Sequence, residues 1–386
     1  MMVLGAMASG IVLDFGNMQS LRNNPVAQDA IAGIIRDADK QLITPCPSVM
    51  DKKRVTPSGD KHDYFSMARY WWPNPKTEDG LPYIRKDGQT NPDTEDLDHK
   101  ALDRFGKMLR IYSLAYFFSG KEEYADKGWD LLRTWFINKK TRMNPHMGYS
   151  QVRMGHNNNQ GSHSGLLDGY AFLYVPDAVA ILSDASCTRQ NDIRLIRQWF
   201  SDYLEWMMTS GQGMKENNAD NNHGTAYHIQ VAVYAAFAGN DSIAGAWRLS
   251  FPEQRVFPQV ETDGRQPFEL VRTRAFGYSC YNLVHYLDML DICRLAGNNL
   301  MEDPEVAKDI ANAIDFLIPF LGKPVSAWPF MQIADWEKEQ QKLCWILYRA
   351  DFYLPDKGYM ALFEQYNNAK AKDRNFLLFP RRDSAR

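Results

Sequence analysis

The feature that most constrains the fold is a succession of helical patterns that fills the chain from residue 99 to residue 366. Apolar side chains recur at helical spacing in each, as Phe105, Met108 and Tyr112 do between Leu102 and Phe118. No strand-like alternation persists between 99 and 370, which argues against a sheet-based fold. The predicted helices are 27–42, 102–118, 122–136, 166–183, 192–208, 223–238, 242–249, 274–296, 304–321, 336–349 and 357–366.

These helices are joined alternately by short turns and by long polar connections. The long connections are residues 46–98, 138–164, 209–222 and 251–268. We interpret this as an all-α fold, a single α/α toroid of helical hairpins whose long loops form a cleft. A plain helical bundle is the alternative. We expect one domain over residues 1–386, with 1–60 as an N-terminal docking segment and 61–98 as a cleft loop, because a loop this long is usually functional.

Composition limits the partners. The net charge is −3, so no global field attracts a polyanion, and an acidic ligand must be met by local Arg and Lys side chains. We expect no nucleic-acid partner and no membrane span, and the oligomeric state stays open. The apolar start, Met1 to Gly10, suggests the remnant of a trimmed secretory signal, hence a periplasmic or secreted protein. The five Cys residues show no paired or metal spacing, and they do not settle the compartment.

The cleft loop carries an aromatic run, Tyr70-Trp71-Trp72, directly after Arg69. One interpretation is an aromatic clamp that packs the loop against the body of the protein. The other is a sugar-binding wall, because pyranose faces stack on Trp and Tyr, with Arg69 meeting a flanking carboxylate. Both interpretations remain open from the sequence.

The connection 151–164 is rich in amides and imidazoles. Gln151, Arg153, Asn157 and Asn158 could bind sugar hydroxyls and carboxylates, and His163 could act as a second base on the opposite sugar face. A solvated loop with self-capping Asn side chains is the alternative.

Two later segments each begin a helix with a polar face. At about 100° per residue, His223, Tyr227, Gln230 and Tyr234 fall within an arc of roughly 60°. A second stripe of the same width contains Arg274, Tyr278, Tyr281 and His285. We expect both stripes to face a wet cleft, although aromatic stripes at this spacing are more often packing.

These residue types suit β-elimination at a uronic acid. That reaction needs donors that neutralise the sugar carboxylate, a base for the C5 proton and an acid for the leaving O4. Asn222, His223 and either Arg272 or Arg274 supply the donors, and Tyr278 supplies an acid or base. A neighbouring cation would have to favour the ionised phenol for base work.

Several motifs together resemble the alginate-lyase domain family over about residues 60 to 290. They are the segment from Asp63 to Asn74, Gly80-Leu81-Pro82-Tyr83 with Asn91-Pro92 after it, Tyr149-Ser150-Gln151, Asn222-His223 and Arg272-Thr273-Arg274-Ala275-Phe276-Gly277-Tyr278. The resemblance implies an α/α toroid that cleaves a polyuronate without a cofactor.

The resemblance also implies site residues. It assigns carboxylate neutralisation to Asn222, His223 and Arg272 or Arg274, and the acid/base role to Tyr278, with Tyr281 in reserve. The commonest family pattern has His immediately before that Tyr, whereas this chain has Gly277. The departure suggests a separate branch, so either alginate or glucuronan could be the substrate.

Two other functions and a metal site compete with this interpretation. A glycoside hydrolase needs a pair of carboxylates, for which Asp168, Asp220, Asp263 and Glu269 are available without a convincing pair. A non-catalytic uronate-binding module would leave the polar stripes idle. A metal could bind His223 and His228, but a spacing of five suits one helical face poorly, so we expect no metal.

Overall fold

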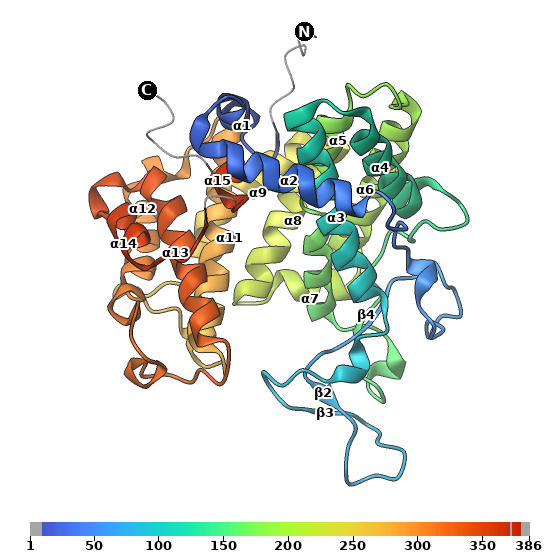
Figure 1. Cartoon of the computed structure of the whole chain (residues 1–386). Helices are drawn as coiled ribbons and strands as arrows, with labels where there is room; N and C mark the ends of the chain where they lie inside the picture. Colours follow the sequence, from blue (N-terminus) through green and yellow to red (C-terminus); the bar gives the residue numbers. More distant parts are fainter. Residues whose placement is uncertain (1–9, 371–372, 380–386) are drawn as a thin grey trace. The chain divides into compact units, whose positions relative to one another are not determined.

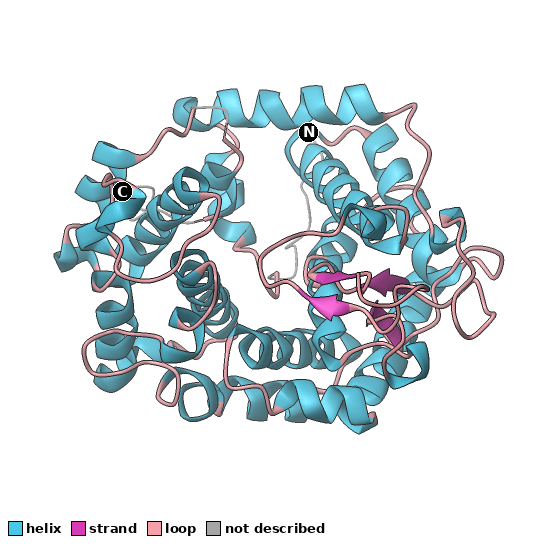
Figure 2. Ribbon diagram, turned by 90° about the horizontal axis from the view of Figure 1, so that it is seen from below, coloured by secondary structure: helices cyan, strands magenta, loops and turns pink. Residues whose placement is uncertain are grey.

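The computed structural model describes residues 10–370 and 373–379, which form two compact units. Within the described residues, unit 1 comprises 31–218 and 233–244, and unit 2 comprises 10–30, 219–232, 245–370 and 373–379. The signal remnant expected at the start of the chain lies outside the described residues except for Gly10. Nearly all regular structure is helical, and the strands are short (Figure 2). The expectation of one domain stays a prediction.

Unit 1 is built mainly from helices joined by long connections (Figure 1). Helix α3 (Asp98–Ser119) packs against α4 (Glu122–Leu132) and α5 (Val175–Leu182). It ends at Gly120, whose left-handed backbone (φ 70°) lets its N–H reach the carbonyl of Tyr116. The other helices of this unit are α2 (Gln28–Gln41) from Ile31 onward, α6 (Gln190–Thr209), α7 (Gly211–Asn217) and the last turns of α8 (Asn222–Ala238).

The core of unit 1 is a set of aromatic side chains from separate segments. Phe105, Phe136 and Phe172 are almost fully buried. The ring centroid of Phe172 lies 6.1 Å from that of Phe105 and 5.6 Å from that of Phe136, in edge-to-face geometry. Trp199 joins them and donates its indole N–H to the Met143 carbonyl at 2.8 Å, so its polar atom is satisfied.

Short strands lie inside the long connections of unit 1. β1 (Phe65–Met67) pairs in parallel with β4 (Tyr149–Val152), and β2 (Trp71–Trp72) pairs antiparallel with β3 (Ile84–Arg85). The sequence predicted none of these strands, including β4 within the stretch 99–370, where no strand-like alternation persists. Strands this short contain too few residues to leave a period-2 pattern in the sequence.

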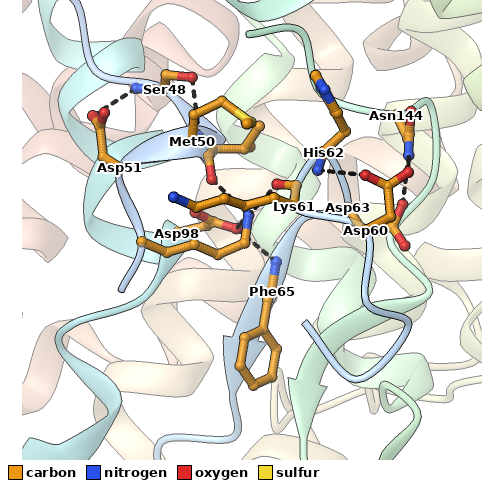
Figure 3. A network of polar contacts seen from close by, with 12 residues as sticks. Ser48, Met50, Asp51, Asp60, Lys61, His62, Asp63, Phe65, Asp98 and Asn144 are labelled. Atoms are coloured by element: carbon orange, nitrogen blue, oxygen red, sulfur yellow. Dashed lines mark hydrogen bonds and ion pairs between the residues drawn. The ribbon is translucent and has the colours of Figure 1, made fainter. Parts of the chain in front are cut away.

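A buried ion pair fastens the start of the long 46–98 segment to α3. Lys52 Nζ lies 2.8 Å from Asp98 Oδ2, and both side chains are fully buried. The ammonium also donates to the carbonyls of Val49 and Lys61, at 2.6 Å each. Asp98 in turn accepts the backbone N–H of Phe65 at 2.8 Å, which fixes the start of β1 (Figure 3). All three ammonium donors are thus used, as burial of a charge requires.

Unit 2 is organised around α11 (Ala275–Leu295). This helix packs against α10 (Pro267–Leu270), α12 (Pro304–Asp315) and α13 (Trp336–Tyr353). The unit also contains α1 (Phe15–Leu21), the first turns of α8, α9 (Asp241–Leu249) from Gly245 onward, α14 (Tyr359–Tyr366) and α15 (Asn375–Leu378). Asp14, which caps α1, pairs with Arg294 of α11 at 2.9 Å, so this part of the N-terminal segment packs on the helices of unit 2.

Most helices begin and end close to the predicted residues, but several segments differ, and α1 and α15 were not predicted. The predicted linker 209–222 contains α7, the predicted helix 166–183 is a 3₁₀-helix (His163–Phe172) followed by α5, and the predicted helix 304–321 ends at Asp315. One stretch, residues 157–182, is apolar enough to cross a membrane by length and composition alone. That is weak evidence, because the stretch is mostly buried and core helices of soluble proteins pass the same test.

Candidate active site

The start of α8 is held by a buried carboxylate. Asn222 donates its backbone N–H to Glu269 Oε1 at 2.6 Å and its side-chain Nδ2 to Oε2 at 2.8 Å. An ionised carboxylate only accepts hydrogen bonds, so this contact fixes which way the Asn222 amide points. Both residues are buried, Asn222 completely. Glu269 therefore clamps the first turn of α8, rather than standing free as a hydrolase carboxylate would.

Positive charge surrounds this clamp within unit 2. Burial raises the pKa of Glu269, and the donors of Asn222 and the nearby His223 and Arg272 lower it in part. His223 follows Asn222 in the chain and is only half-buried. The site therefore combines a buried acid with two basic side chains that reach toward its surface.

Arg272 makes the contact with the candidate acid/base. Its Nη2 donates to the Tyr278 hydroxyl at 2.9 Å, and its guanidinium carbon lies 4.0 Å from the centroid of the same ring. A planar guanidinium stacks and hydrogen-bonds in this way, whereas a lysine does not. Both side chains are half-buried.

Arg274 has a different partner from the one its place in the predicted stripe indicated. It is the N-cap of α11 rather than a helical residue, and its Nη2 lies 2.6 Å from Asp335 Oδ2. Its backbone bridges to Gln332. As counted, Arg274 lies one turn before Tyr278, whose backbone N–H donates to the Arg274 carbonyl at 2.9 Å, but the Arg274 guanidinium is paired with Asp335.

The rest of the second stripe lies on α11 as predicted. Tyr281 is half-buried, and its ring centroid lies 4.3 Å from that of His285. His285 is fully buried, and burial, with the charges of His223 and Lys342, lowers its pKa to about 3. His285 is therefore neutral at neutral pH and lies buried against the Tyr281 ring.

The first stripe does not face solvent. Tyr227, Gln230 and Tyr234 are 2% exposed or less, so the expected wet face of α8 is limited to His223. Tyr227 packs against Trp247, with ring centroids 5.8 Å apart, which removes it from the candidate substrate-binding residues. Periodicity alone does not separate a buried polar stripe from a wet one.

His228 is a core residue. Its Nε2 lies 2.5 Å from the Trp247 carbonyl, and Arg255 Nε donates to its Nδ1 at 3.4 Å. Burial, the largest effect, and Arg255 together lower its pKa to about 3. Among the described residues, no group of three or more His, Cys, Asp and Glu side chains is arranged to hold a metal ion.

In unit 1, the aromatic run forms a cationic and aromatic surface. Trp71 lies 4.8 Å (ring centroid to guanidinium carbon) from Arg153, and Trp72 lies 4.7 Å from Lys86 Nζ. His156 meets the edge of Trp71, with ring centroids 4.9 Å apart. Both Trp rings are half-buried, so they pack locally and still keep surface for a ligand.

Gln151 lines a small polar pocket in the same unit. The pocket is lined by Ser66, Met67, Arg69, Thr94, His99, Gln151 and Asp168. Asp168 accepts hydrogen bonds from Tyr64, Ser66 and Gln151, at 3.0, 2.7 and 2.9 Å. These bonds hold the Gln151 amide, whose backbone takes a left-handed conformation (φ 47°). Asp168, weighed from the sequence only as a hydrolase carboxylate, thus orients a pocket residue.

The other residues predicted in this connection differ in how far other side chains hold them in place. His163 Nδ1 lies 2.7 Å from Oε2 of the buried Glu216. Since an ionised carboxylate only accepts hydrogen bonds, Nδ1 carries the hydrogen in the neutral imidazole, and the lone pair is on Nε2. Asn157 and Asn158 are exposed in left-handed conformations, which Asn tolerates, and Tyr70 is half-buried beside the Trp residues.

The structure therefore brings together two groups of the predicted residues, one in each unit. Unit 2 joins Asn222, His223, Arg272 and Tyr278, and adds Glu269. In unit 1, Gln151 and Arg69 share a pocket and Arg153 lies on Trp71. The clamp by Glu269 was missed, because no local pattern links it to Asn222, which is 47 residues away.

Comparisons with known proteins agree on one family. A family model described as alginate lyase matches residues 48–328. The crystal structure of an alginate lyase from Bacteroides ovatus is 41% identical, with a TM-score of 0.93, over 97% of this chain and 99% of that one.

More distant structures share the fold. Alginate lyase A1-III from Sphingomonas species A1 is 12% identical with a TM-score of 0.55, over 94% of this chain and 99% of that chain. A variant of A1-III complexed with a tetrasaccharide is 14% identical with a TM-score of 0.57, over 92% and 97%. A search of curated proteins found no match. The predicted fold class, an all-α chain of the α/α toroid type, is confirmed by these neighbours.

Proposed function

Because the chain belongs to the alginate lyase family, we propose that it depolymerises alginate by β-elimination, with the charged group in unit 2 as its active site. The family makes it a polysaccharide lyase. The Bacteroides ovatus relative, described as an alginate lyase, supports alginate as the polymer. The observation that carries the proposal is the contact between Arg272 and the Tyr278 hydroxyl beside the Glu269 clamp.

The proposed reaction breaks the C4–O4 bond of the chain. A base takes the proton on C5, the electrons left behind form the C4–C5 double bond, and an acid gives O4 its proton. Negative charge grows on the uronate carboxylate as the C5 proton leaves, so preorganised donors stabilise that state. We assign these donors to His223 and Arg272, which are half-buried and basic. Asn222 is fully buried, so we assign it the role of holding the first turn of α8.

Tyr278 is the proposed acid/base. A guanidinium beside a phenol favours its ionised form, and Arg272 Nη2 lies 2.9 Å from this hydroxyl. Tyr281, one turn further on α11, remains the reserve. His163 stays the predicted second base, with Nε2 as the nitrogen that would accept the proton, because Nδ1 lies against Glu216. Two of the carboxylates considered for hydrolysis, Glu269 and Asp168, do not favour that reaction, because each accepts a hydrogen bond from a side-chain amide.

The test is incubation of the purified protein with polymannuronate, polyguluronate and polyglucuronate. We expect near-UV absorbance from new unsaturated ends to rise in step with new reducing ends. Reducing ends without that absorbance would mean hydrolysis. Activity on polyglucuronate alone would make glucuronan, rather than alginate, the substrate.

Two matched pairs of variants test the residue roles. Tyr278→Phe keeps the ring and removes the proton carrier, so kcat should fall about 10²–10⁴-fold with folding unchanged. Arg272→Lys should lower kcat steeply because Lys loses the guanidinium that stacks on the Tyr278 ring, whereas Arg274→Lys should change kcat little. If Tyr281→Phe loses activity and Tyr278→Phe does not, the role belongs one turn further along α11.

A further inference from the structure

In unit 2, α13 places an ion pair against α11 at Gly277, the residue before the candidate acid/base. Glu339 of α13 lies directly over Gly277, next to Tyr278 in the chain. A Cβ added at Gly277 would lie 3.0 Å from Glu339 Cδ and 3.1 Å from its Cγ, so the Glu339 side chain occupies the space that a larger residue would need. The glycine at this position is therefore explained by the close approach of α13.

Glu339 in turn fixes a lysine. Its carboxylate lies 2.5 Å from Lys342 Nζ, and the two side chains are 8% and 28% exposed. An ion pair on an ordinary helix surface is exposed at both partners, but here the acid is buried. A buried carboxylate requires a partner, so the Lys342 ammonium is held in place rather than mobile.

Lys342 is held toward the site rather than away from it. Its Nζ lies 5.8 Å from the centroid of the Tyr281 ring. Its charge also helps to lower the pKa of His285, after burial and the charge of His223. The partly exposed ammonium thus belongs to the same surface as Tyr281 and His223. Glu339 uses only one of the three N–H donors of Lys342.

We propose that Lys342 is a substrate-binding residue that meets a uronate carboxylate of the polymer, and that Glu339 is the positioning residue that holds it there. Every sugar of a polyuronate carries a carboxylate, and His223 with Arg272 serve the sugar that undergoes elimination. Lys342 serves the carboxylate of a neighbouring sugar, as a point charge on the Tyr281 side of α11. This inference rests on the proposed lyase function and extends it to chain binding.

The experiment compares the KM and kcat of Lys342→Met with those of Lys338→Met on the same polyuronate. Lys338 lies on the same helix, one turn earlier, and is exposed, so it matches the charge change without the position. Loss of a charged contact to substrate should raise KM about fivefold or more for Lys342→Met, with kcat within about twofold. Salt should shrink the difference, since a partly exposed contact is screened. Lys342→Arg keeps the positive charge and should have a KM close to that of the wild-type protein.

A double variant guards against misfolding. Lys342→Met leaves Glu339 buried without its partner, so Lys342→Met/Glu339→Gln removes both charges and should fold with the same raised KM. Equal KM values for the Lys342 and Lys338 variants would overturn the inference while leaving the lyase function intact. A wild-type protein inactive on every polyuronate would instead refute the proposed function.

Discussion

The buried pair between Lys52 and Asp98 allows a quantitative prediction about stability. Lys52→Met removes the ammonium and leaves a buried carboxylate and the carbonyls of Val49 and Lys61 without their donor. Breaking one side of a buried ion pair costs about 3–5 kcal/mol of unfolding free energy. Each orphaned carbonyl could add about 1–3 kcal/mol, although relaxation and water keep such terms from adding fully. We therefore expect a loss of about 4 kcal/mol at pH 7.

The loss of unfolding free energy should depend on pH, in a direction that follows from the raised pKa of Asp98. Burial raises the pKa of Asp98 to about 7 even with Lys52 beside it, well above its usual value of 3.8. A folded-state pKa above the unfolded one means that the folded protein binds the proton more tightly. Stability from this group is therefore full below pH 4 and declines as pH rises toward 7. Without Lys52 the decline should extend to higher pH.

Urea unfolding followed by tryptophan fluorescence measures these free energies. The control is Lys52→Met/Asp98→Asn, which lacks the titrating carboxylate and should lose less stability than Lys52→Met at pH 8. The two variants should converge toward pH 4. A loss below about 1 kcal/mol for Lys52→Met, equal at both pH values, would refute the reasoning that this pair anchors the segment.

Three further changes test the site. Glu269→Gln keeps the shape of the side chain but offers one oxygen acceptor where Asn222 uses two. The unfolding free energy should therefore fall by about 1–3 kcal/mol, with a lower kcat/KM. Unchanged stability and activity would refute the role of Glu269 as a clamp. Asp168→Asn should release the Gln151 amide and raise KM with little change in melting temperature, which steady-state kinetics and thermal unfolding together measure. Trp71→Ala should raise KM for the polymer more than it lowers the melting temperature, whereas a mainly thermal effect would make this ring a clamp rather than a sugar-binding surface.

The helices were predictable because each buries a recurring apolar face. Between Asp98 and Ser119, for example, the buried positions repeat along the whole length of α3. Short elements were not predictable from the sequence, since α7 and the strands are stabilised by pairing and packing with distant segments. β1, for instance, pairs with β4, whose residues lie more than eighty positions later in the chain.

The residue types of the candidate site were predictable, but their partners were not. Counting along a helix placed Tyr278 and Tyr281 on one face correctly. Counting did not show that the Arg274 guanidinium pairs with Asp335, nor that the stripe containing Tyr227 is buried. Burial and long-range clamps such as Glu269 depend on the folded chain, which a single sequence does not display.

The anchor between Lys52 and Asp98 also determines how freely the loop that it closes can change in length. The two residues lie about forty-six positions apart, and the entropy of closing a flexible loop grows only with the logarithm of its length, about 0.6 kcal/mol for each doubling. Between them the tip at 76–79 is exposed, and its side chains are not buried against the rest of the protein. Insertions at this tip should therefore cost little stability and leave the ion pair at the base of the segment intact.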